Sequence, residues 1–504
     1  SIRPEWRTYL FDLAFQKYVV EKNYPECKIE SYLMLADKSK KASIDGLNQL
    51  FQITNDPNIR TGIRRKVHSL KETGNPIMEP RNLSQLIDDI IKKNNHKIHG
   101  LSFLELLDNF TYLYTNEKEI NWKNYNGHVC RECWMEQFNI SDQDENRPNI
   151  YEIWLFRNQK KLFKSNIFFL DQLSKNDFDD PTDTHLSIKN RQWLQVEKRV
   201  DESRGKSVDF YLDAENLKDK MMKWKFPLHF IDFETCTSAL PFTKGRHPYE
   251  QIAFQYSHHI VYSNGNIEHK SEYINAEPGK FPNYEFVRSL KKDLENDNGS
   301  VFKYATHENS ILNAIYDQLI DSEEKDKDEL MDFIKTITNK KENNELIRKG
   351  DRDMIDMCDL VKKYFYDSYM KGSNSIKVVL PAVIKICEFV NKKYSKPISE
   401  INLTSLNFSG NHVWIKDGNL DPYSSLPAPD FSKIENPVGD INKLNNGGDA
   451  LTAYAKIQYQ DMSKQERTII KQSLLKYCEL DTLAMVMIYE FFACEIKIHG
   501  FSNQ

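Results

Sequence analysis

The sequence contains no stretch of about 18 uncharged apolar residues, so no segment is a candidate for a membrane-spanning helix. We expect no signal peptide, and the eight cysteines are scattered at irregular spacing along 504 residues. This scarcity excludes a small disulfide-stapled domain and predicts a protein of the reducing cytoplasm. Basic residues do not dominate either, because 69 lysines and arginines stand against 74 aspartates and glutamates, a formal charge of −5. A strongly basic, chromatin-type binder is therefore excluded.

The chain does contain enough apolar and aromatic residues for a folded core. Apolar residues make up 39% and aromatic residues 12%, which indicates a globular rather than a disordered protein. At roughly 150 residues per domain, the length corresponds to about two to four domains. We expect three segments, which are residues 1–60, 61–200 and 201–504.

The segment from residue 225 onward has the clearest order of elements. Residues 227–234 favour a short apolar strand, and residues 251–274 favour a hairpin with a Gly-containing turn. Further elements are expected in the order helix 284–294, strand 301–306, helix 309–320 and a last long helix within 463–496. This order predicts an α/β fold, a mixed sheet with helices on its faces. The densely charged residues 321–350 are expected to form a solvated helix pair.

Two carboxylates lie at the end of the first of these strands. In the segment FIDFET, Asp232 and Glu234 point to the same face because strand side chains alternate. Like charges this close repel unless a cation lies between them, and hard oxygen ligands suit Mg²⁺ or Mn²⁺. Two such ions about 4 Å apart can hold an attacking water and a leaving phosphate oxygen. An Asp-x-Glu pattern is also common by chance in acidic proteins, so a purely structural interpretation stays open.

Two further places offer residues for such a site. Tyr477 and Asp481 are four residues apart in a predicted helix, so a tyrosine that orients water and a carboxylate that binds metal would share one face. Glu308 stands at a strand-to-helix junction and supplies another carboxylate, although it can equally complement the helix dipole. Asp356 and Asp359 are its rivals for this position in the middle of the domain.

Together these residues resemble the signature of the DEDD superfamily of 3′–5′ exonucleases, which have a ribonuclease-H-like fold. The Tyr-x₃-Asp pattern resembles the DEDDy subgroup, because the DEDDh variant would need histidine where this chain has Lys476. The family usually has aspartate in the mid-domain motif, where Glu308 must serve here. The resemblance implies two Mg²⁺ or Mn²⁺ ions bound by four carboxylates, with a tyrosine that orients the water. The residues concerned are Asp232, Glu234, Glu308, Asp481 and Tyr477.

A closer resemblance is to the bacterial domain-of-unknown-function family 2779. It is carried by several stretches in order, namely residues 230–235, 245–257, 372–381, Asp421-Pro422-Tyr423 and 474–486. The resemblance covers roughly residues 225–495. It supports the exonuclease-like fold without naming a substrate.

In that family the exonuclease-like part often follows a RecB-like nuclease of the PD-(D/E)xK type. Residues 12–18, with Gln16, resemble the Gln-bearing helix that follows the catalytic Glu-x-Lys of such nucleases. The chain begins at Ser1 and soon enters an apolar segment, so we expect the catalytic residues of that domain to precede it. Residues 1–60 would then be a partial RecB-like domain, 61–200 a helical insertion and 201–504 the exonuclease-like domain. An ordinary amphipathic helix is the alternative for residues 12–18.

The insertion contains a C-x₂-C pattern, Cys130 to Cys133. This spacing suits Zn²⁺ or an iron–sulfur cluster, but a metal site needs four ligands. Two plain thiols are the alternative.

Nucleic acid is the expected partner, and the RecB-like association favours DNA. Arg246, His247, Tyr249 and Lys377 are candidate contacts to it, and basic clusters at 60–66 and 157–164 are further candidates. Solvated helix faces are the alternative for these clusters. The sequence thus predicts a cytoplasmic, metal-dependent 3′–5′ exonuclease, with protein partners in a defence or repair complex. A catalytically weak nucleic-acid-binding subunit of such a complex is the second interpretation.

Overall fold

The computed structural model describes residues 2–54, 62–93, 96–98, 100–118, 134–178, 186–416, 418–435, 437–438, 441 and 444–497. The chain divides into two compact units. The first unit comprises Ser1–Asp37, Ile77–Pro181 and Gln192–Ser207, and the second comprises Lys38–Pro76, Thr182–Arg191 and Val208–Gln504. Apart from its first residues, the expected exonuclease-like segment 201–504 falls within the second unit. The assignment of residues 1–60 to a nuclease fragment stays a prediction.

Two apolar cores lie in the described part of the first unit. Its elements are α1 (Pro4–Asn23), β1 (Tyr32–Ala36), β4 (Met78–Asn82), α2 (Ser84–Lys92), α3 (Phe103–Thr115), α4 (Trp134–Gln137), α5 (Gln159–Lys164) and most of α6 (Ile188–Ser203). One core joins α1 to α2 and α3, and beside it Lys17 forms an ion pair with Asp88 at 2.7 Å. The other core gathers aromatic side chains around Trp134. Gln16 donates to Asp12 at 2.9 Å, so its side-chain amide bonds to a residue of the same helix, α1.

The second unit contains the remaining elements. Its strands are β2 (Phe51–Ile53), β3 (Ile63–Arg65), β5 (Tyr211–Leu212), β6 (Leu228–Thr237), β7 (Gln251–Val261), β8 (Ile267–Ile274), β9 (Val301–Lys303), β10 (Asn339–Glu342), β11 (Glu345–Lys349), β12 (Ile355–Asp356), β13 (Phe365–Tyr366) and β14 (Leu403–Thr404). Its helices are α7 (Ala214–Met221), α8 (Asn283–Leu294), α9 (His307–Ile320), α10 (Lys327–Ile337), α11 (Met357–Tyr364), α12 (Ile376–Ile386), α13 (Glu388–Tyr394), α14 (Gly447–Tyr459) and α15 (Lys464–Glu495).

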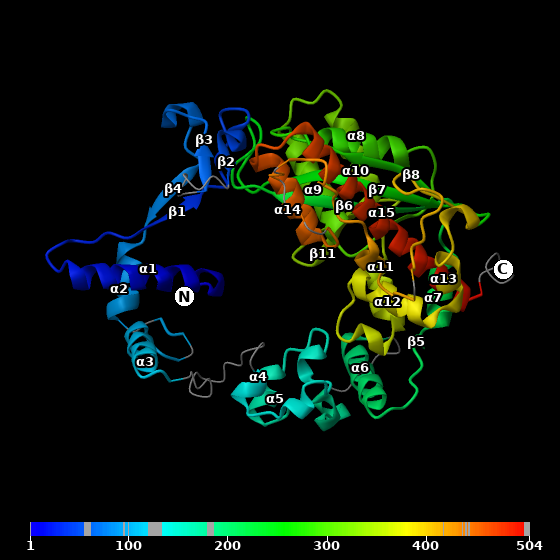
Figure 1. Ribbon diagram of the computed structural model, residues 1–504, viewed down its shortest axis with the longest axis horizontal. Coiled ribbons are helices and arrows are strands. Elements are labelled where there is room, and N and C mark those ends of the chain that lie inside the picture. The colour runs from blue at the N-terminus through cyan, green and yellow to red at the C-terminus, as the bar shows by residue number, and fades with distance from the viewer. Residues whose placement is uncertain are drawn as a thin grey trace. The chain divides into compact units, whose positions relative to one another are not determined.

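Six of these strands form one mixed sheet in the order β12-β9-β6-β7-β8-β14. Figure 1 labels its strands β6, β7 and β8. Neighbours β6, β7 and β8 are antiparallel, whereas β9 pairs parallel with β6, β12 with β9, and β14 with β8. The predicted α/β fold with a mixed sheet is therefore confirmed. The three antiparallel strands thus have two parallel strands, β9 and β12, beside β6 and one parallel strand, β14, beside β8.

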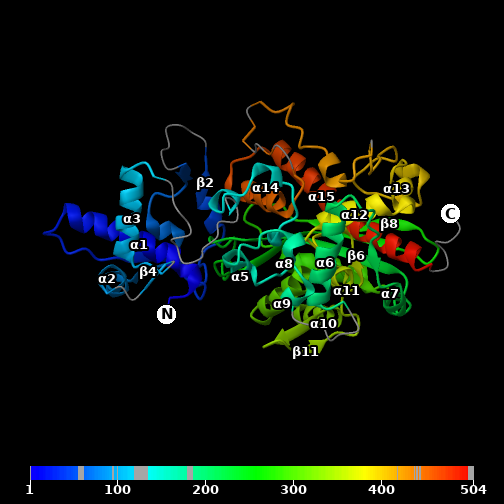
Figure 2. The ribbon, with the colours of Figure 1, turned by 90° about the horizontal axis from the view of Figure 1, so that it is seen from below.

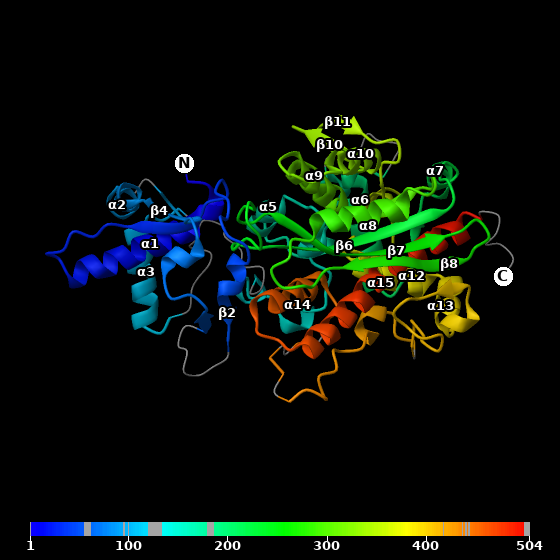
Figure 3. The ribbon, with the colours of Figure 1, turned by 90° about the horizontal axis from the view of Figure 1, so that it is seen from above.

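Helices cover both faces of this sheet. Figure 3 shows α8, α9 and α10 on one side of β6 and β7, with α14 and α15 on the other. The alternation of β6 explains the two layers, because Ile231 and Phe233 join the core under α8 to α10 while Phe230 faces α15. Asp232 and Glu234 share the face of Phe230. They therefore point towards α15.

The last helix, α15, runs along the sheet and changes from orange to red in Figure 2. Ser463 and Glu466 form a capping box at its start, in which the Ser463 hydroxyl accepts from the Glu466 N–H and the Glu466 carboxylate accepts from the Ser463 N–H. Every residue from Tyr477 to Ala493 is buried, because other helices cover the side that faces away from the sheet. Across the described residues, no helix combines the length and the apolar content needed to cross a bilayer.

The charged segment 321–350 differs from the expected helix pair. Its first part is α10, but its second part is the antiparallel hairpin of β10 and β11. Asn343 and Asn344 make the turn with φ values of 50° and 68°, a left-handed conformation that asparagine tolerates. The prediction of a second helix was wrong because the two asparagines favour a tight turn over helix continuation.

Candidate metal-binding active site

Three carboxylates meet between the sheet and α15. Ligand oxygens of Asp232, Glu234 and Asp481 all lie within 4.8 Å of one another. Asp232 and Glu234 come from β6, and the register with β7 shifts directly after Glu234. Asp481 comes from near the middle of α15. The first strand and the last helix of the predicted exonuclease-like domain thus bring their acidic residues together.

Glu308 lies beside this trio, in the first turn of α9. Its side chain is 2% exposed, and its Oε2 atom has no hydrogen-bond partner among the described residues. Its charge raises the pKa of both Asp232 and Glu234, which shows how close the four groups lie. In the described part of the chain, nothing donates a hydrogen bond to this buried acceptor.

Burial and mutual repulsion raise the pKa of the carboxyl groups in this cluster. For Asp232 and Glu234 burial is the larger cause, and the charge of Asp481 comes next. Burial also raises the pKa of Asp481, and it raises the pKa of Glu308 to about 8. Four buried carboxyl groups whose negative charges repel one another are typical of a site in which a bound ligand balances the charge.

The donor set fits hard divalent cations. All four groups are carboxylates, the ligands that Mg²⁺ and Mn²⁺ prefer. The unused Oε2 atom of Glu308 gives such an ion a buried acceptor. The residues present therefore fit the two-ion site that the family resemblance implies.

The rivals of Glu308 have structural roles. Asp356 caps α11 by accepting from the backbone N–H of Asp359 at 3.1 Å, and it pairs with Lys303 at 3.3 Å. Asp359 is half-exposed and pairs with Lys363 at 2.7 Å. Glu308 is thus the mid-domain carboxylate that faces the cluster.

Lys377 enters the site from the first turn of α12. Its ammonium donates to the Tyr477 hydroxyl at 2.7 Å and to a backbone carbonyl at 2.8 Å. The same ammonium lies 4.6 Å from the ring centroid of Tyr477 and 4.8 Å from that of Tyr423. Its positive charge lowers the pKa of Glu234 and Asp481. Lys377 is therefore part of the cluster, and a direct contact between it and nucleic acid stays a prediction.

Tyr423 is a site residue that sequence reasoning missed. Its hydroxyl donates to Asp481 Oδ1 at 2.6 Å, and its side chain is buried. Asp421 accepts from the Tyr423 N–H at 3.0 Å and starts a short 3₁₀ turn. Tyr477 also lowers the pKa of Asp481, so both tyrosines favour the charged form of this carboxylate. The tripeptide Asp421-Pro422-Tyr423 is one of the motifs that carry the family resemblance. Only the structure shows that its tyrosine contacts Asp481.

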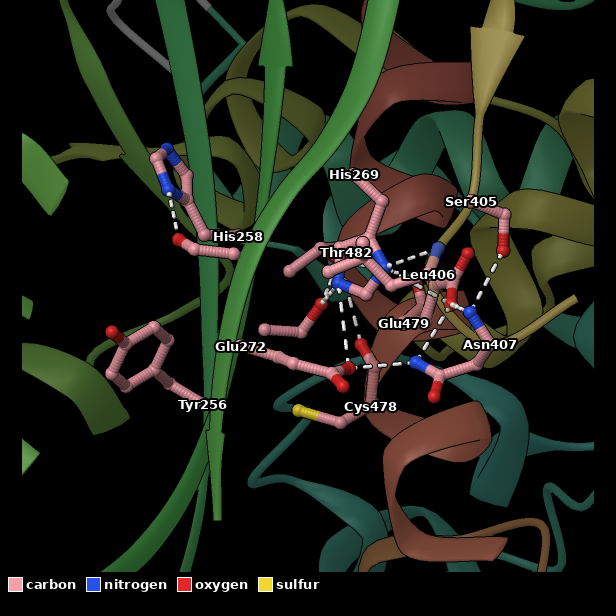
Figure 4. Close-up of polar contacts among 12 residues, drawn as sticks. Tyr256, His258, His269, Glu272, Ser405, Leu406, Asn407, Cys478, Glu479 and Thr482 are labelled. Atoms are coloured by element: carbon pink, nitrogen blue, oxygen red, sulfur yellow. Dashed lines mark hydrogen bonds and ion pairs between the residues drawn. The ribbon is translucent and has the colours of Figure 1, made fainter. Parts of the chain in front are cut away.

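A buried polar network fixes α15 next to the carboxylates. Figure 4 shows its side chains converging from β8, from the turn after β14 and from α15. His269 Nδ1 lies 3.0 Å from the Glu479 carboxylate with both side chains fully buried, and Asn407 donates to Glu479 at 2.9 Å. The Thr482 hydroxyl lies 2.7 Å from His259 Nδ1. Because Glu479 and Thr482 flank Asp481 in sequence, these contacts fix the helical segment that presents it.

The loop before β7 carries three of the predicted nucleic-acid contacts. The Arg246 carbonyl accepts from the Ala42 N–H at 2.9 Å, and His247 Nδ1 lies 2.9 Å from the Lys40 carbonyl. These contacts join the loop to the segment around residue 42. Tyr249 is 45% exposed at a φ of 60°, and the Lys38 ammonium lies 5.3 Å from its ring centroid. Nucleic-acid binding by these three residues stays a prediction.

Other predicted sites fall partly or wholly outside the described residues. Cys130 and Cys133, the expected Zn²⁺ or iron–sulfur ligands, lie there, as does Arg60 of the first basic cluster. Arg64 and Arg65 of that cluster are exposed on β3. The cysteine site thus stays a prediction.

The sheet, its helical layers and the buried acids define an α/β protein with a candidate metal centre. Residues 229–375 match the profile of a family described as Domain of unknown function (DUF2779). The matched segment contains Asp232, Glu234 and Glu308 and ends shortly before Lys377. The resemblance inferred from the sequence is confirmed for this segment. No curated protein and no solved structure gives a significant match to the chain.

Proposed function

We propose that this protein is a metal-dependent nuclease of the bacterial cytoplasm, a 3′–5′ exonuclease that hydrolyses phosphodiesters of nucleic acid, with DNA favoured. The convergence of Asp232, Glu234 and Asp481 within 4.8 Å, with buried Glu308 beside them, carries the proposal. Their raised pKa values support it, because such a cluster is unfavourable without bound cations.

The residues around the acids support hydrolysis. Two bound Mg²⁺ or Mn²⁺ ions would supply an activated water and charge stabilisation at the leaving oxygen. Tyr477 accepts from Lys377 at 2.7 Å, so its hydroxyl is held beside the acids. One lone pair of that hydroxyl stays available to accept from a water, which would orient the water for in-line attack. Tyr423 holds Asp481 on its other side.

A nuclease assay tests this proposal directly. Single-stranded DNA and RNA, labelled at either end, are incubated with Mg²⁺, Mn²⁺ or EDTA. We expect metal-dependent shortening from the 3′ end by the wild type and loss of at least 10²-fold in rate for Asp232→Asn and Asp481→Asn. Asp359→Asn is the matched control, since this aspartate is half-exposed and away from the cluster. Activity that survives both site variants would contradict the proposal.

One observation favours a second candidate function, a catalytically weak nucleic-acid-binding subunit with protein partners in a defence or repair complex. Glu308 stands where an aspartate is usual, and its pKa of about 8 keeps it largely protonated at neutral pH before a cation binds. Tight, metal-dependent binding of labelled DNA without release of mononucleotides would favour this alternative. Substitution Glu308→Asp would then be expected to raise the cleavage rate.

A further inference from the structure

A second group of metal-ligating side chains lies at the far end of α15. We propose that Cys387, Cys494 and Glu495 bind a zinc-like, thiophilic divalent cation that joins the C-terminal ends of α12 and α15. The two sulfurs and one carboxylate oxygen all lie within 4.8 Å of one another. The proposal does not depend on nuclease activity, because none of these residues belongs to the carboxylate cluster.

Cys387 has the surroundings of a thiolate ligand. It follows α12 directly, is 3% exposed, and lies beside the backbone N–H groups of Phe389 and Val390, which lower the pKa of its thiol. Such N–H donors stabilise negative charge on sulfur. Burial nevertheless raises the thiol pKa to about 11, so a cation is needed to displace the proton at neutral pH.

Cys494 and Glu495 complete the set from the last turn of α15. Both are partly exposed, which leaves a route for an ion from solvent. Burial raises the pKa of Glu495, whose carboxylate lies beside the two sulfurs.

The spacing of the donor atoms suits a tetrahedral ion better than a disulfide. Around a tetrahedral Zn²⁺, with three protein ligands, water as the fourth and Zn–S bonds of about 2.3 Å, ligand atoms lie about 3.8 Å apart. Donors already within 4.8 Å need a movement of about 1 Å to reach that geometry. A disulfide would require sulfurs about 2.05 Å apart and would not involve the Glu495 carboxylate. Thiolate and carboxylate ligands together favour Zn²⁺ over Mg²⁺.

The position of the site gives it a structural consequence. α12 carries Lys377 at its beginning, and α15 carries Tyr477 and Asp481. An ion held by Cys387 and the end of α15 would tie these two helices together at their far ends.

Titration with Cd²⁺ tests the site by a signal that carboxylates do not give, the thiolate-to-cadmium absorption in the ultraviolet. The full chain is used under reducing conditions with Cys130→Ser and Cys133→Ser, which removes the other cysteine pair. We expect one equivalent of thiolate-bound Cd²⁺, displaced by Zn²⁺. Cys387→Ser and Cys494→Ser should each abolish the signal, and Glu495→Gln should weaken Cd²⁺ binding about tenfold. Cys358→Ser, at a buried free cysteine, is the matched control and should change nothing.

Absence of the thiolate signal, or a signal that survives both Cys387→Ser and Cys494→Ser, would overturn the proposal. Circular dichroism of each variant separates loss of a ligand from loss of the fold. Cys494 is the less buried of the two, so Cys494→Ser keeps the test decisive if Cys387→Ser fails to fold. We also expect Zn²⁺ to raise the midpoint of thermal unfolding in the chain with both cysteines and to leave it unchanged in Cys494→Ser.

Discussion

The ammonium of Lys377 donates to the hydroxyl of Tyr477 at 2.7 Å across 100 residues of chain. This contact joins the beginning of α12 to the middle of α15. It places a fixed positive charge next to Glu234 and Asp481, whose pKa values it lowers. Lys377 thus supplies part of the counter-charge before any cation binds.

Substitution Lys377→Met should shift the pH dependence of metal binding. Without the ammonium the pKa values of Glu234 and Asp481 rise further, so ionisation of these ligands, and with it Mg²⁺ or Mn²⁺ binding, requires a higher pH. Calorimetric titration with Mn²⁺ at several pH values measures this midpoint. Lys377→Arg keeps the charge and should stay close to the wild type. An unchanged midpoint in Lys377→Met would show that the lysine does not act on these acids.

Substitution Asp232→Asn should stabilise the metal-free protein. It removes one of the buried carboxylates that repel one another, so we expect the unfolding midpoint without metal to rise by a few degrees, on the scale of about 2–4 °C per kcal/mol. Thermal unfolding with EDTA and with Mg²⁺ measures both states. Mg²⁺ should stabilise the wild type and have little effect on the variant. A lower midpoint in EDTA would instead mean that Asp232 supports the fold.

The metal-free protein should lose stability as the pH rises from about 5 to about 8. Burial raises the pKa of Glu308 from its ordinary value of 4.5 to about 8 in the folded protein, so the folded state binds more protons than the unfolded state between these values. The stabilisation is complete below pH 4.5 and is lost as Glu308 ionises near pH 8. Chemical unfolding in EDTA across this range measures the slope. Glu308→Gln should flatten it, and an equal slope in that variant would assign the effect to other groups.

Substitution Asp356→Ala should lower the stability of the fold without weakening metal binding. Loss of the α11 cap should lower the free energy of unfolding by about 1 kcal/mol, with a further loss from the ion pair to Lys303. Metal affinity should not fall, because the charge of Asp356 opposes ionisation of Glu308. Chemical unfolding and Mn²⁺ titration measure the two effects. A large loss of Mn²⁺ binding would return Asp356 to the list of ligands.

The parts of the structure that depend on local periodicity were predictable from the sequence. Alternation along a strand placed Asp232 and Glu234 on one face, and helical spacing placed Tyr477 near Asp481. The contribution of Tyr423 was not predictable, because it depends on how a loop with no periodic pattern folds back onto α15. The hairpin of β10 and β11 was missed for a related reason, since its charged residues carry no apolar pattern that distinguishes strand from helix.

The position of Asp481 along α15 also bears on how the site opens. Tyr477 and Asp481 lie near the middle of the 32 residues of this helix, inside its fully buried segment and far from either end. Helix ends fray with little free energy, whereas a buried middle turn opens only when its whole surroundings open. Backbone amides of residues 478–481 should therefore be among the slowest in the chain to exchange with solvent deuterium. An incoming ligand would therefore bind next to a segment of α15 whose backbone is already in place.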